Sequence, residues 1–469
     1  MELQRPAVPP PDESTFDLLI RATETIEYPN WSLAGESKFA VGERRFHAPI
    51  MESARTPQDL ILKCRDSNHE FHRTDMGPYG STAPVFTALA PDSSWEFHGG
   101  FLAGTGISST IGDHATLHFR SFDQRLRDGE VATSALVYVD APTVVFPDRL
   151  PVPTGMRRPR FMEHGLQCSL FGHHALIRGV EMSELSDFGR AIVVVWDGPP
   201  LSGSRPRALR IVLSFLLGGW VQPVMSYTTD RDGHVLRRRI TALGDPLRRA
   251  HTPPLELRFA QNVRDIGTQL DGMLSRCERL LGDEVELDVA LGHLFADHDG
   301  IDIEIRDVAL TLDSLVESPL FKPPRRRLIA KPRFVEVKAS LLERLSEIIT
   351  AEESEFVGRV ANVLALAQHD STGDRRRAFW EAVGFNLSER ELEALEHRDT
   401  MSHAGYIAFD HADDAAWNAL VRDAHILRTL VNRVILALLG FNGDAMSYET
   451  GELIHVTAAA PIATSRTPL

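Results

Sequence analysis

The sequence predicts a mixed α+β protein with more than one domain, in which a strand-rich N-terminal part precedes a helical C-terminal part. Its 469 residues exceed what one hydrophobic core usually organises. Residues 1–250 combine abundant Gly, Pro, Ser and Thr with short β-branched runs, a pattern typical of strands joined by turns. From about residue 258 the apolar residues recur with helical periodicity. We therefore expect a strand-rich recognition domain over 1–250 and a helical region over 251–469.

Four segments of the N-terminal part carry the Val, Ile, Leu and Thr content that suits a pleated sheet. They are residues 115–120, 134–139, 191–196 and 235–241. One helix is expected among them at 208–217, because its apolar residues recur at spacings of three and four. Gly218 and Gly219 follow this helix directly and are expected to end it.

The helical part begins with apolar residues that advance by three or four positions and therefore share one helix face. They are Ile301, Ile305, Val308, Leu312 and Leu315. Their helix should end before Pro319, and residues 319–332 form a proline-broken connector. Further helices are expected at 334–349, 352–368, 375–383, 388–398 and 414–439. Ser388 and Glu391 have capping-box spacing, and Gly440 is expected to end the last helix.

Composition and charge limit the classes of function. A net charge of -15 disfavours a protein that coats nucleic acid non-specifically, although a local basic patch can still bind it. The three cysteines lie far apart and predict neither a disulfide scaffold nor a zinc knuckle. The first residues lack the pattern of a secretory signal, and no apolar run is long enough to cross a bilayer. We expect a cytoplasmic protein that is not associated with a membrane.

The candidate catalytic pair is Arg398 and His403, in the stretch EHRDTMSHAGY, where a predicted helix meets the loop before the last helix. A guanidinium can fork onto two phosphate oxygens, and an imidazole transfers protons near neutral pH. Such a pair suits cleavage of a phosphodiester without a metal. Spacing alone favours a surface salt bridge, because Arg65 and His72 stand at a similar separation in the strand-rich part. The context of the pair therefore decides between these interpretations.

That context resembles a known family. The stretch RDTMSH is similar to the R-polar-x3-H motif of HEPN domains, in which Asp is a common second residue, as Asp399 is here. HEPN domains are bundles of four or five helices, and the resemblance covers about residues 285–445. The segment IDIEIRDVALTLDSLVES resembles an early helix of the ApeA-like branch, and LLGFNGDAMSY resembles its closing segment. That branch often carries a strand-rich N-terminal domain.

The resemblance implies an endoribonuclease that acts as a homodimer, with two motifs facing one another across a cleft for RNA. The ribose 2'-hydroxyl would attack the adjacent phosphate, with His403 as acid or base, Arg398 holding the phosphate and Asp399 orienting them. Asp313 is the closest match to an acidic residue that many relatives carry on an early helix, and Glu317 lies one turn later. The resemblance further implies defence against phage by RNA degradation. A phage-derived trigger or a nucleotide would then bind the N-terminal domain.

Two further features have a functional and an ordinary interpretation. Arg325, Arg326 and Arg327 could follow an RNA backbone, or they could belong to a solvated connector. Tyr406 could stack on a base, although packing is the commoner role. A second basic run at 375–377 is open to the same two interpretations. The stretch HLFADHDGIDIE contains histidines and carboxylates, but its spacing is poor for one metal ion, and no P-loop is present. We expect no metal and no cofactor.

The sequence is compatible with two alternatives to a ribonuclease. In the first, the helical part only dimerises or holds a nucleotide, and the N-terminal domain recognises a ligand. The presence of both Arg398 and His403 favours the enzyme over this non-catalytic module. In the second, the strand-rich part is a carbohydrate-active β-sandwich, but it lacks a persuasive pair of carboxylates.

Overall fold

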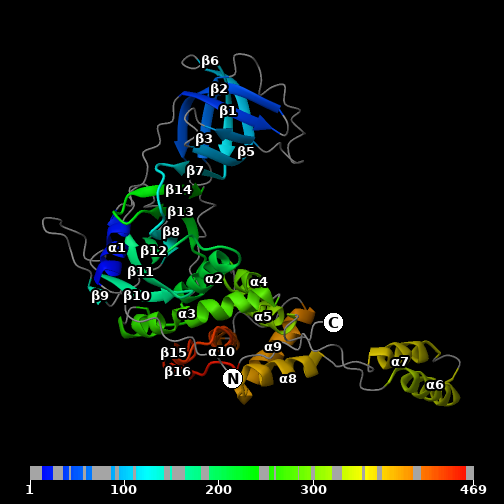
Figure 1. Cartoon of the computed structure of the whole chain (residues 1–469). Helices are drawn as coiled ribbons and strands as arrows, with labels where there is room; N and C mark the ends of the chain where they lie inside the picture. The colour runs from blue at the N-terminus through cyan, green and yellow to red at the C-terminus, as the bar shows by residue number, and fades with distance from the viewer. Residues whose placement is uncertain are drawn as a thin grey trace. The chain divides into compact units, whose positions relative to one another are not determined.

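A computed structural model describes the following residues: 13–24, 35–41, 44–55, 60–65, 86–89, 95–108, 112–141, 148–149, 164–180, 190–241, 253–257, 260–283, 285–296, 301–318, 330–350, 354–366, 372–404 and 414–460. The chain forms two compact units, residues 1–275 and 276–469, and the division falls within helix α3 (Ala260–Gly282). Strands dominate the first unit and helices the second, so the predicted α+β class is confirmed (Figure 1). No described helix is both long and apolar enough to cross a membrane.

Part of the first unit is a closed ring of antiparallel strands. Strand β4 pairs with both β1 and β5, and this double pairing closes the ring. Around the ring the order is β4 (Phe86–Leu89), β1 (Gly35–Val41), β2 (Arg44–Arg55), β3 (Leu60–Arg65), β6 (Gly112–Phe119) and β5 (Trp95–Ser108). Alternate residues of β3 are fully buried, as the period of two along a strand requires. These residues are Leu60, Leu62 and Cys64.

An open antiparallel sheet continues from the ring. Strands β6 and β7 are separated only by Arg120, and both pair with β5. From β7 (Ser121–Arg125) the sheet runs through β14 (Val235–Thr241), β13 (Gln222–Thr229), β8 (Thr133–Ala141), β12 (Arg190–Asp197), β11 (His173–Val180), β10 (His164–Leu170) and β9 (Asp148–Arg149). The expected strands at 115–120, 134–139, 191–196 and 235–241 are β6, β8, β12 and β14 with small shifts of their ends.

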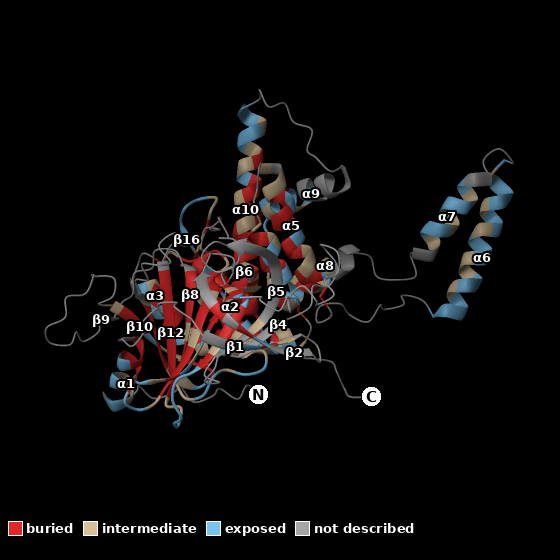
Figure 2. Cartoon of the chain, turned by 90° about the horizontal axis from the view of Figure 1, so that it is seen from above, coloured by how far each residue is buried: buried red, intermediate tan, exposed pale blue. Residues whose placement is uncertain are grey.

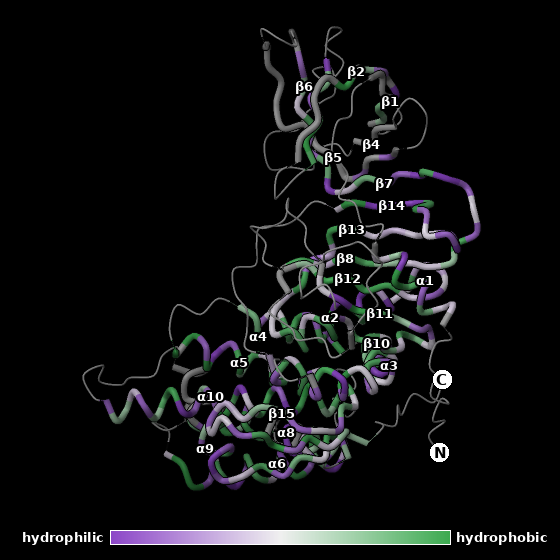
Figure 3. The backbone as a smooth tube through the Cα atoms, turned by 90° about the vertical axis from the view of Figure 1, so that its left-hand side faces the viewer, coloured by the Kyte–Doolittle hydropathy of each residue, from purple (hydrophilic) through white to green (hydrophobic). Residues whose placement is uncertain are grey.

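Helices cover both faces of the open sheet. Helix α1 (Glu13–Glu24) packs on β12, β11 and β8, and its apolar residues share a core with Val193 and Val195. The intervening Ile192 faces the other side, where Leu213 of α2 (Arg205–Leu217) and Val263 of α3 line the same apolar space. Figure 1 shows α1 and α2 on opposite sides of these strands, and Figure 3 shows apolar residues along β8, β12 and α2.

The C-terminus of α1 is held by two buried side chains. Arg178 of β11, which is 1% exposed, donates from Nη2 to the Thr23 carbonyl at 3.2 Å. The Tyr227 hydroxyl of β13 donates to the Ala22 carbonyl at 2.9 Å. Carbonyls at a helix end lack partners in the helix and carry partial negative charge, which a cation stabilises. Burial raises the pKa of Tyr227 above its ordinary range, and the nearby Arg178 partly opposes this.

Helix α2 ends where the sequence predicts. Gly218 adopts a left-handed conformation with φ of 76° and donates its N–H to the Phe215 carbonyl at 3.1 Å. The Gly219 N–H donates to the Ser214 carbonyl at 2.9 Å. A residue with a Cβ would be strained at this φ, which explains glycine at the stop.

The second unit has α5 and α10 at its centre, packed against each other and against α8 and α9. The helices of this group are α4 (Leu287–Leu294), α5 (Ile301–Val316), α8 (Thr372–Val383), α9 (Glu389–Ala404) and α10 (Asp414–Leu438). The hairpin of β15 (Gly443–Met446) and β16 (Leu453–Val456) follows α10. The predicted stripe of α5 is buried from Ile305 to Leu315, and Gly440 ends α10 with φ of 80°, so both predictions are confirmed. Figure 2 shows buried residues along α5 and α10.

Helices α6 (Lys331–Ile348) and α7 (Ser354–Leu366) pack against each other. The sequence predicts that Pro332 lies in the connector before helix α6. The helix instead begins at Lys331, and its first turn contains Pro332. Proline is tolerated there because the first N–H groups of a helix have no partner within it. None of the described residues of α6 is buried.

Candidate functional site

The candidate site is built around α9, whose start is fixed by the predicted capping box. The Ser388 N–H donates to the Glu391 carboxylate at 2.8 Å, and the Glu391 N–H donates to the Ser388 hydroxyl at 3.3 Å. These two hydrogen bonds satisfy donors that the first turn of a helix leaves without partners. The capping box is confirmed, and it sets the register of every later residue in α9.

Helix α9 extends further than predicted. The predicted helix ends at Arg398, but α9 continues to Ala404. Arg398, Asp399 and His403 therefore all lie on helical backbone. The prediction of a loop here is wrong because neither glycine nor proline interrupts the chain before Gly405. Positions five apart on a helix are separated by about 140° around its axis. The side chains of these three residues lie outside the described part of the chain.

Two ion pairs fix α9 to its neighbours. Arg433 of α10 contacts Glu391 at 2.6 Å, and its guanidinium lies 4.9 Å from the ring centre of Phe385. Arg390 contacts Glu449 at 2.9 Å. Ala394, three positions after Glu391, is fully buried. Position 398 continues this inward row, because positions four and seven apart recur on one helix face.

Asp313, the predicted acidic residue, lies on α5 and is half-buried. Its carboxylate is 3.7 Å from the guanidinium of Arg376 on α8. A second contact joins Glu304 of α5 to Arg428 of α10, and both side chains are mostly buried. Two carboxylates of α5 therefore meet arginines from two different helices.

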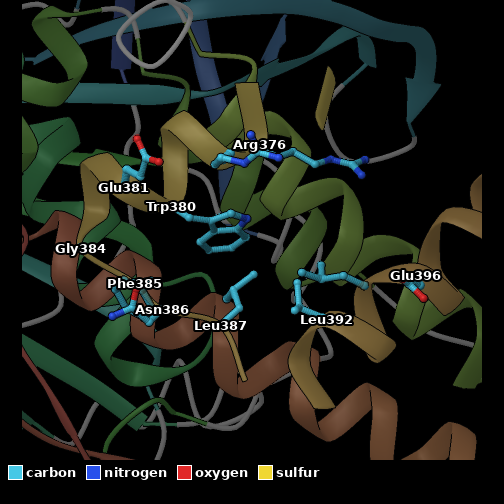
Figure 4. Close-up of a pocket in the computed structure, with 11 residues that line it drawn as sticks. Arg376, Trp380, Glu381, Gly384, Phe385, Asn386, Leu387, Leu392 and Glu396 are labelled. Atoms are coloured by element: carbon cyan, nitrogen blue, oxygen red, sulfur yellow. The ribbon is translucent and has the colours of Figure 1, made fainter. Parts of the chain in front are cut away.

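A cavity of about 770 Å³ lies between α8 and α9 (Figure 4). Arg376, Arg377 and Trp380 of α8 line one side, and Leu392 and Glu396 of α9 line the other. The segment that joins the two helices contributes Gly384, Phe385, Asn386 and Leu387. Figure 4 shows the Trp380 indole and the Leu387 side chain pointing toward each other. The cavity thus combines an aromatic and apolar wall with two arginines and two carboxylates, Glu381 and Glu396.

The cavity and the motif share one row of α9 positions. Leu392 and Glu396 line the cavity, and helix geometry places positions 399 and 403 within about 20° of the direction of Leu392. Positions 399 and 403 therefore fall in the same backbone row as Leu392, one and two turns beyond Glu396. Helical periodicity was the only sequence signal that positions 399 and 403 share a row with Leu392. That signal could be used only if the helix was known to continue past Arg398.

The remaining predicted residues are placed as follows. Arg325, Arg326, Arg327 and Tyr406 lie outside the described residues. No sequence pattern indicates Trp380 as part of a cavity. Two members of the basic run at 375–377, Arg376 and Arg377, line the cavity.

Among the described residues, one group of side chains brings metal-ligating atoms within 4.8 Å of one another. It consists of Asp230, Asp232 and His234, in the turn between β13 and β14. The Asp230 carboxylate accepts bonds from the N–H groups of Asp232 and His234 at 3.0 and 2.9 Å, as in an Asx-turn. Burial alone would raise the pKa of Asp230, but the hydrogen bonds from His234 and Asp232 lower it below its ordinary value. The turn therefore explains the cluster without a metal.

Comparison with known proteins adds little to this geometry. No protein-family model and no curated protein matches the sequence. Among solved structures, Hcp2 from Salmonella typhimurium matches over 19% of this chain and 85% of its own, at 8% sequence identity. The TM-score of that match is 0.14, which is too low to support any argument about fold or function.

Proposed function

We propose that the chain is a metal-independent endoribonuclease of the HEPN type that cleaves RNA through its own 2'-hydroxyl. The observation that carries the proposal is the R-D-x3-H motif on α9, whose positions 399 and 403 share a helix row with Leu392, a residue that lines a cavity large enough for a nucleotide. His403 transfers the proton, Arg398 stabilises charge on the phosphate, and Asp399 orients them. The biological role we propose is defence against phage.

The cavity gives the proposal a binding mode for single-stranded RNA. The indole of Trp380 stacks with a base, and Arg376 and Arg377 contact the phosphates on either side of it. Asp313 does not act on the substrate in this scheme. Its contact with Arg376 at 3.7 Å makes it a positioning residue for that arginine.

The separation of about 140° between positions 398 and 403 favours a site completed by a second copy of the chain. Position 403 continues the row that faces the cavity, whereas position 398 continues the row that faces α10. In a homodimer with two-fold symmetry, Arg398 of one copy complements His403 of the other.

The first test measures cleavage of a labelled single-stranded RNA by the purified full-length protein. His403→Ala and Arg398→Ala should each reduce the rate by at least about 100-fold, because general acid–base and charge stabilisation typically contribute that much. Arg422→Ala and His425→Ala, both on α10, are the matched controls and should retain activity. Cleavage should survive EDTA, and one 2'-deoxyribose at the cut position should block it there.

The second test mixes the two inactive variants after subunit exchange. Random mixing makes half of the dimers hybrid. Each hybrid has one intact pair of Arg398 and His403, where a wild-type dimer has two. About a quarter of the wild-type rate should therefore return. A mixture that stays inactive would show that both residues act within one chain. Full activity of both single variants would instead leave the helical unit as the non-catalytic module.

A further inference from the structure

The hairpin of α6 and α7 carries a large share of the exposed apolar residues. Eleven large apolar residues are exposed among those that the structure describes, and five of them lie on these two helices. They are Val335, Leu341, Ile348, Phe356 and Val363. Figure 2 shows exposed residues along both helices. Single exposed apolar residues are normal on protein surfaces, but a concentration of them marks a surface for association.

Four of these residues lie on one face of the hairpin. Residues 349–353 join α6 to α7, and a link this short makes the two helices antiparallel. Leu341 and Ile348 are seven positions apart and therefore share one side of α6. Phe356 and Val363 have the same spacing on α7. Each pair is rotated in the same sense from the half-buried row through which its helix contacts the other, and in antiparallel helices this places both pairs on one face.

The hairpin is too small to be stable through its own packing. It spans residues 331–366, and no described residue of α6 is buried. Structures of fewer than about 40 residues usually need disulfides, a metal or oligomerisation. The segment contains neither cysteine nor histidine, so it has no disulfide and no thiolate or imidazole ligand for a metal. Association through the exposed apolar face is the remaining source of stability.

The charges of the hairpin match those of a second copy. Its base, residues 331–338, carries three positive charges and one negative charge. Its tip, residues 343–355, carries five negative charges and one positive charge. Two hairpins that meet antiparallel place the base of each against the tip of the other, so opposite charges approach at both ends. The acidic tip would be repelled by an RNA backbone and by anionic lipid.

We propose that the hairpin is a self-association module, in which two copies of the chain form an antiparallel four-helix bundle from α6 and α7 of each. The apolar face defined by Leu341, Ile348, Phe356 and Val363 becomes the core of this bundle. A two-fold axis relates the copies, so every contact between a base and a tip occurs twice. The interface lies outside α9 and does not depend on the ribonuclease activity proposed above.

Sedimentation velocity of the full-length protein over a dilution series tests the apolar face. The double variant Leu341→Ala, Ile348→Ala should raise the dissociation constant of self-association at least about tenfold, because a few apolar anchors carry most of the binding energy of an interface. Alanine favours a helix more than leucine or isoleucine does, so circular dichroism should show unchanged helix content. Leu126→Ala is the matched control. Leu126 is 42% exposed, against 48% for Leu341, lies in the strand-rich unit and should leave association unchanged.

Charge reversal tests the antiparallel arrangement. The triple variant Glu343→Lys, Glu347→Lys, Glu355→Lys gives the tip net positive charge, and the double variant Lys331→Glu, Lys338→Glu gives the base net negative charge. Each variant alone brings like charges together at both ends and should weaken association at least about tenfold at low salt. A chain with all five substitutions has opposite charges at its two ends again and should associate as the wild type does.

Four results would overturn the proposal. The first is a wild-type protein that stays monomeric at about 100 µM, because a specific interface binds more tightly than this. The second is an equal dissociation constant for wild type and the Leu341→Ala, Ile348→Ala variant, which would place association on another surface. The third is weak association of the chain with all five charge substitutions, which would contradict antiparallel pairing.

The fourth is a lower unfolding midpoint of the Leu341→Ala, Ile348→Ala variant at every protein concentration, with association unchanged. That result would show that the face is covered by its own chain. None of these measurements reads RNA cleavage, so failure of the ribonuclease proposal would leave their outcome unchanged.

Discussion

Arginines play opposite parts in the two units. In the helical unit each arginine discussed above that joins two helices meets a carboxylate: Arg376 meets Asp313, Arg428 meets Glu304, and Arg433 meets Glu391. In the strand-rich unit, two arginines donate to backbone carbonyls: Arg178 to that of Thr23 and Arg210 to that of Val221. The same side chain thus joins helices through carboxylates in one unit and holds backbone carbonyls in the other. The partner, and not the arginine itself, therefore decides what is lost when the contact is removed.

The largest effect is expected from Glu304→Leu, which leaves Arg428 mostly buried without its partner. Removing one member of a buried pair costs about 3 kcal/mol, because the remaining charge stays desolvated. Adding Arg428→Met should restore most of the loss, since an apolar pair of similar volume is often neutral or stabilising. Urea unfolding of both single variants and the double variant measures the coupling. If Glu304→Leu cost less than about 0.5 kcal/mol, the pair would behave as a surface salt bridge, and the contrast between the units would fail.

A smaller loss is expected for Arg178, which is buried and donates to a backbone carbonyl. Arg178→Met should lower the free energy of unfolding by about 2 kcal/mol, because it leaves the Thr23 carbonyl at the end of α1 without its donor. The apolar replacement keeps most of the packing volume. Thermal unfolding followed by proteolysis of α1 should show that this helix is released first. Unchanged protection of α1 would mean that packing alone holds it.

At high pH, the free energy of unfolding should depend on the buried tyrosines and not on the arginines beside them. Burial raises the pKa of Tyr227 and of Tyr138, so the native state keeps protons that the unfolded chain loses above about pH 10. Stability is therefore complete below that pH and should fall by about 1.4 kcal/mol per pH unit for each tyrosine above it. Unfolding midpoints between pH 8 and 11 measure the slope, with pH 8 as reference. Tyr227→Phe should make it shallower, and an equal slope in that variant would contradict the assignment.

The smallest effect is expected for an exposed arginine. Arg239→Ala should change stability by no more than about 0.5 kcal/mol in either direction, because the side chain is exposed and its hydrogen bond to Ser121 is neutral. The measurement is urea unfolding without phosphate in the buffer. A loss above about 2 kcal/mol would place Arg239 among the structural arginines.

The sequence predicted best where one local period decides the structure. The apolar positions of α5 and α10 recur every three or four residues, and both helices end where Pro319 and Gly440 require. The sequence did not predict α1, because its burial depends on strands far along the chain. The closed ring was also missed, because it depends on β4 pairing with both β1 and β5, which no local pattern encodes.

The candidate site was only partly predictable for the same reason. The motif residues and the capping box are local features, and the capping box is confirmed. The contact between Asp313 and Arg376 joins residues from two helices, and the cavity beside Trp380 needs a third segment.

The docking of α1 has a consequence for synthesis on the ribosome. Its partners Arg178 and Tyr227 are 155 and 205 residues away from the carbonyls they contact. At typical rates of translation, roughly 10 to 40 seconds pass between the emergence of α1 and that of Tyr227. During this interval Leu19 and Ile20, both buried in the finished protein, have no sheet to cover them. The nascent chain therefore presents an apolar helix for which a chaperone would compete, and α1 should be among the last elements to reach its place.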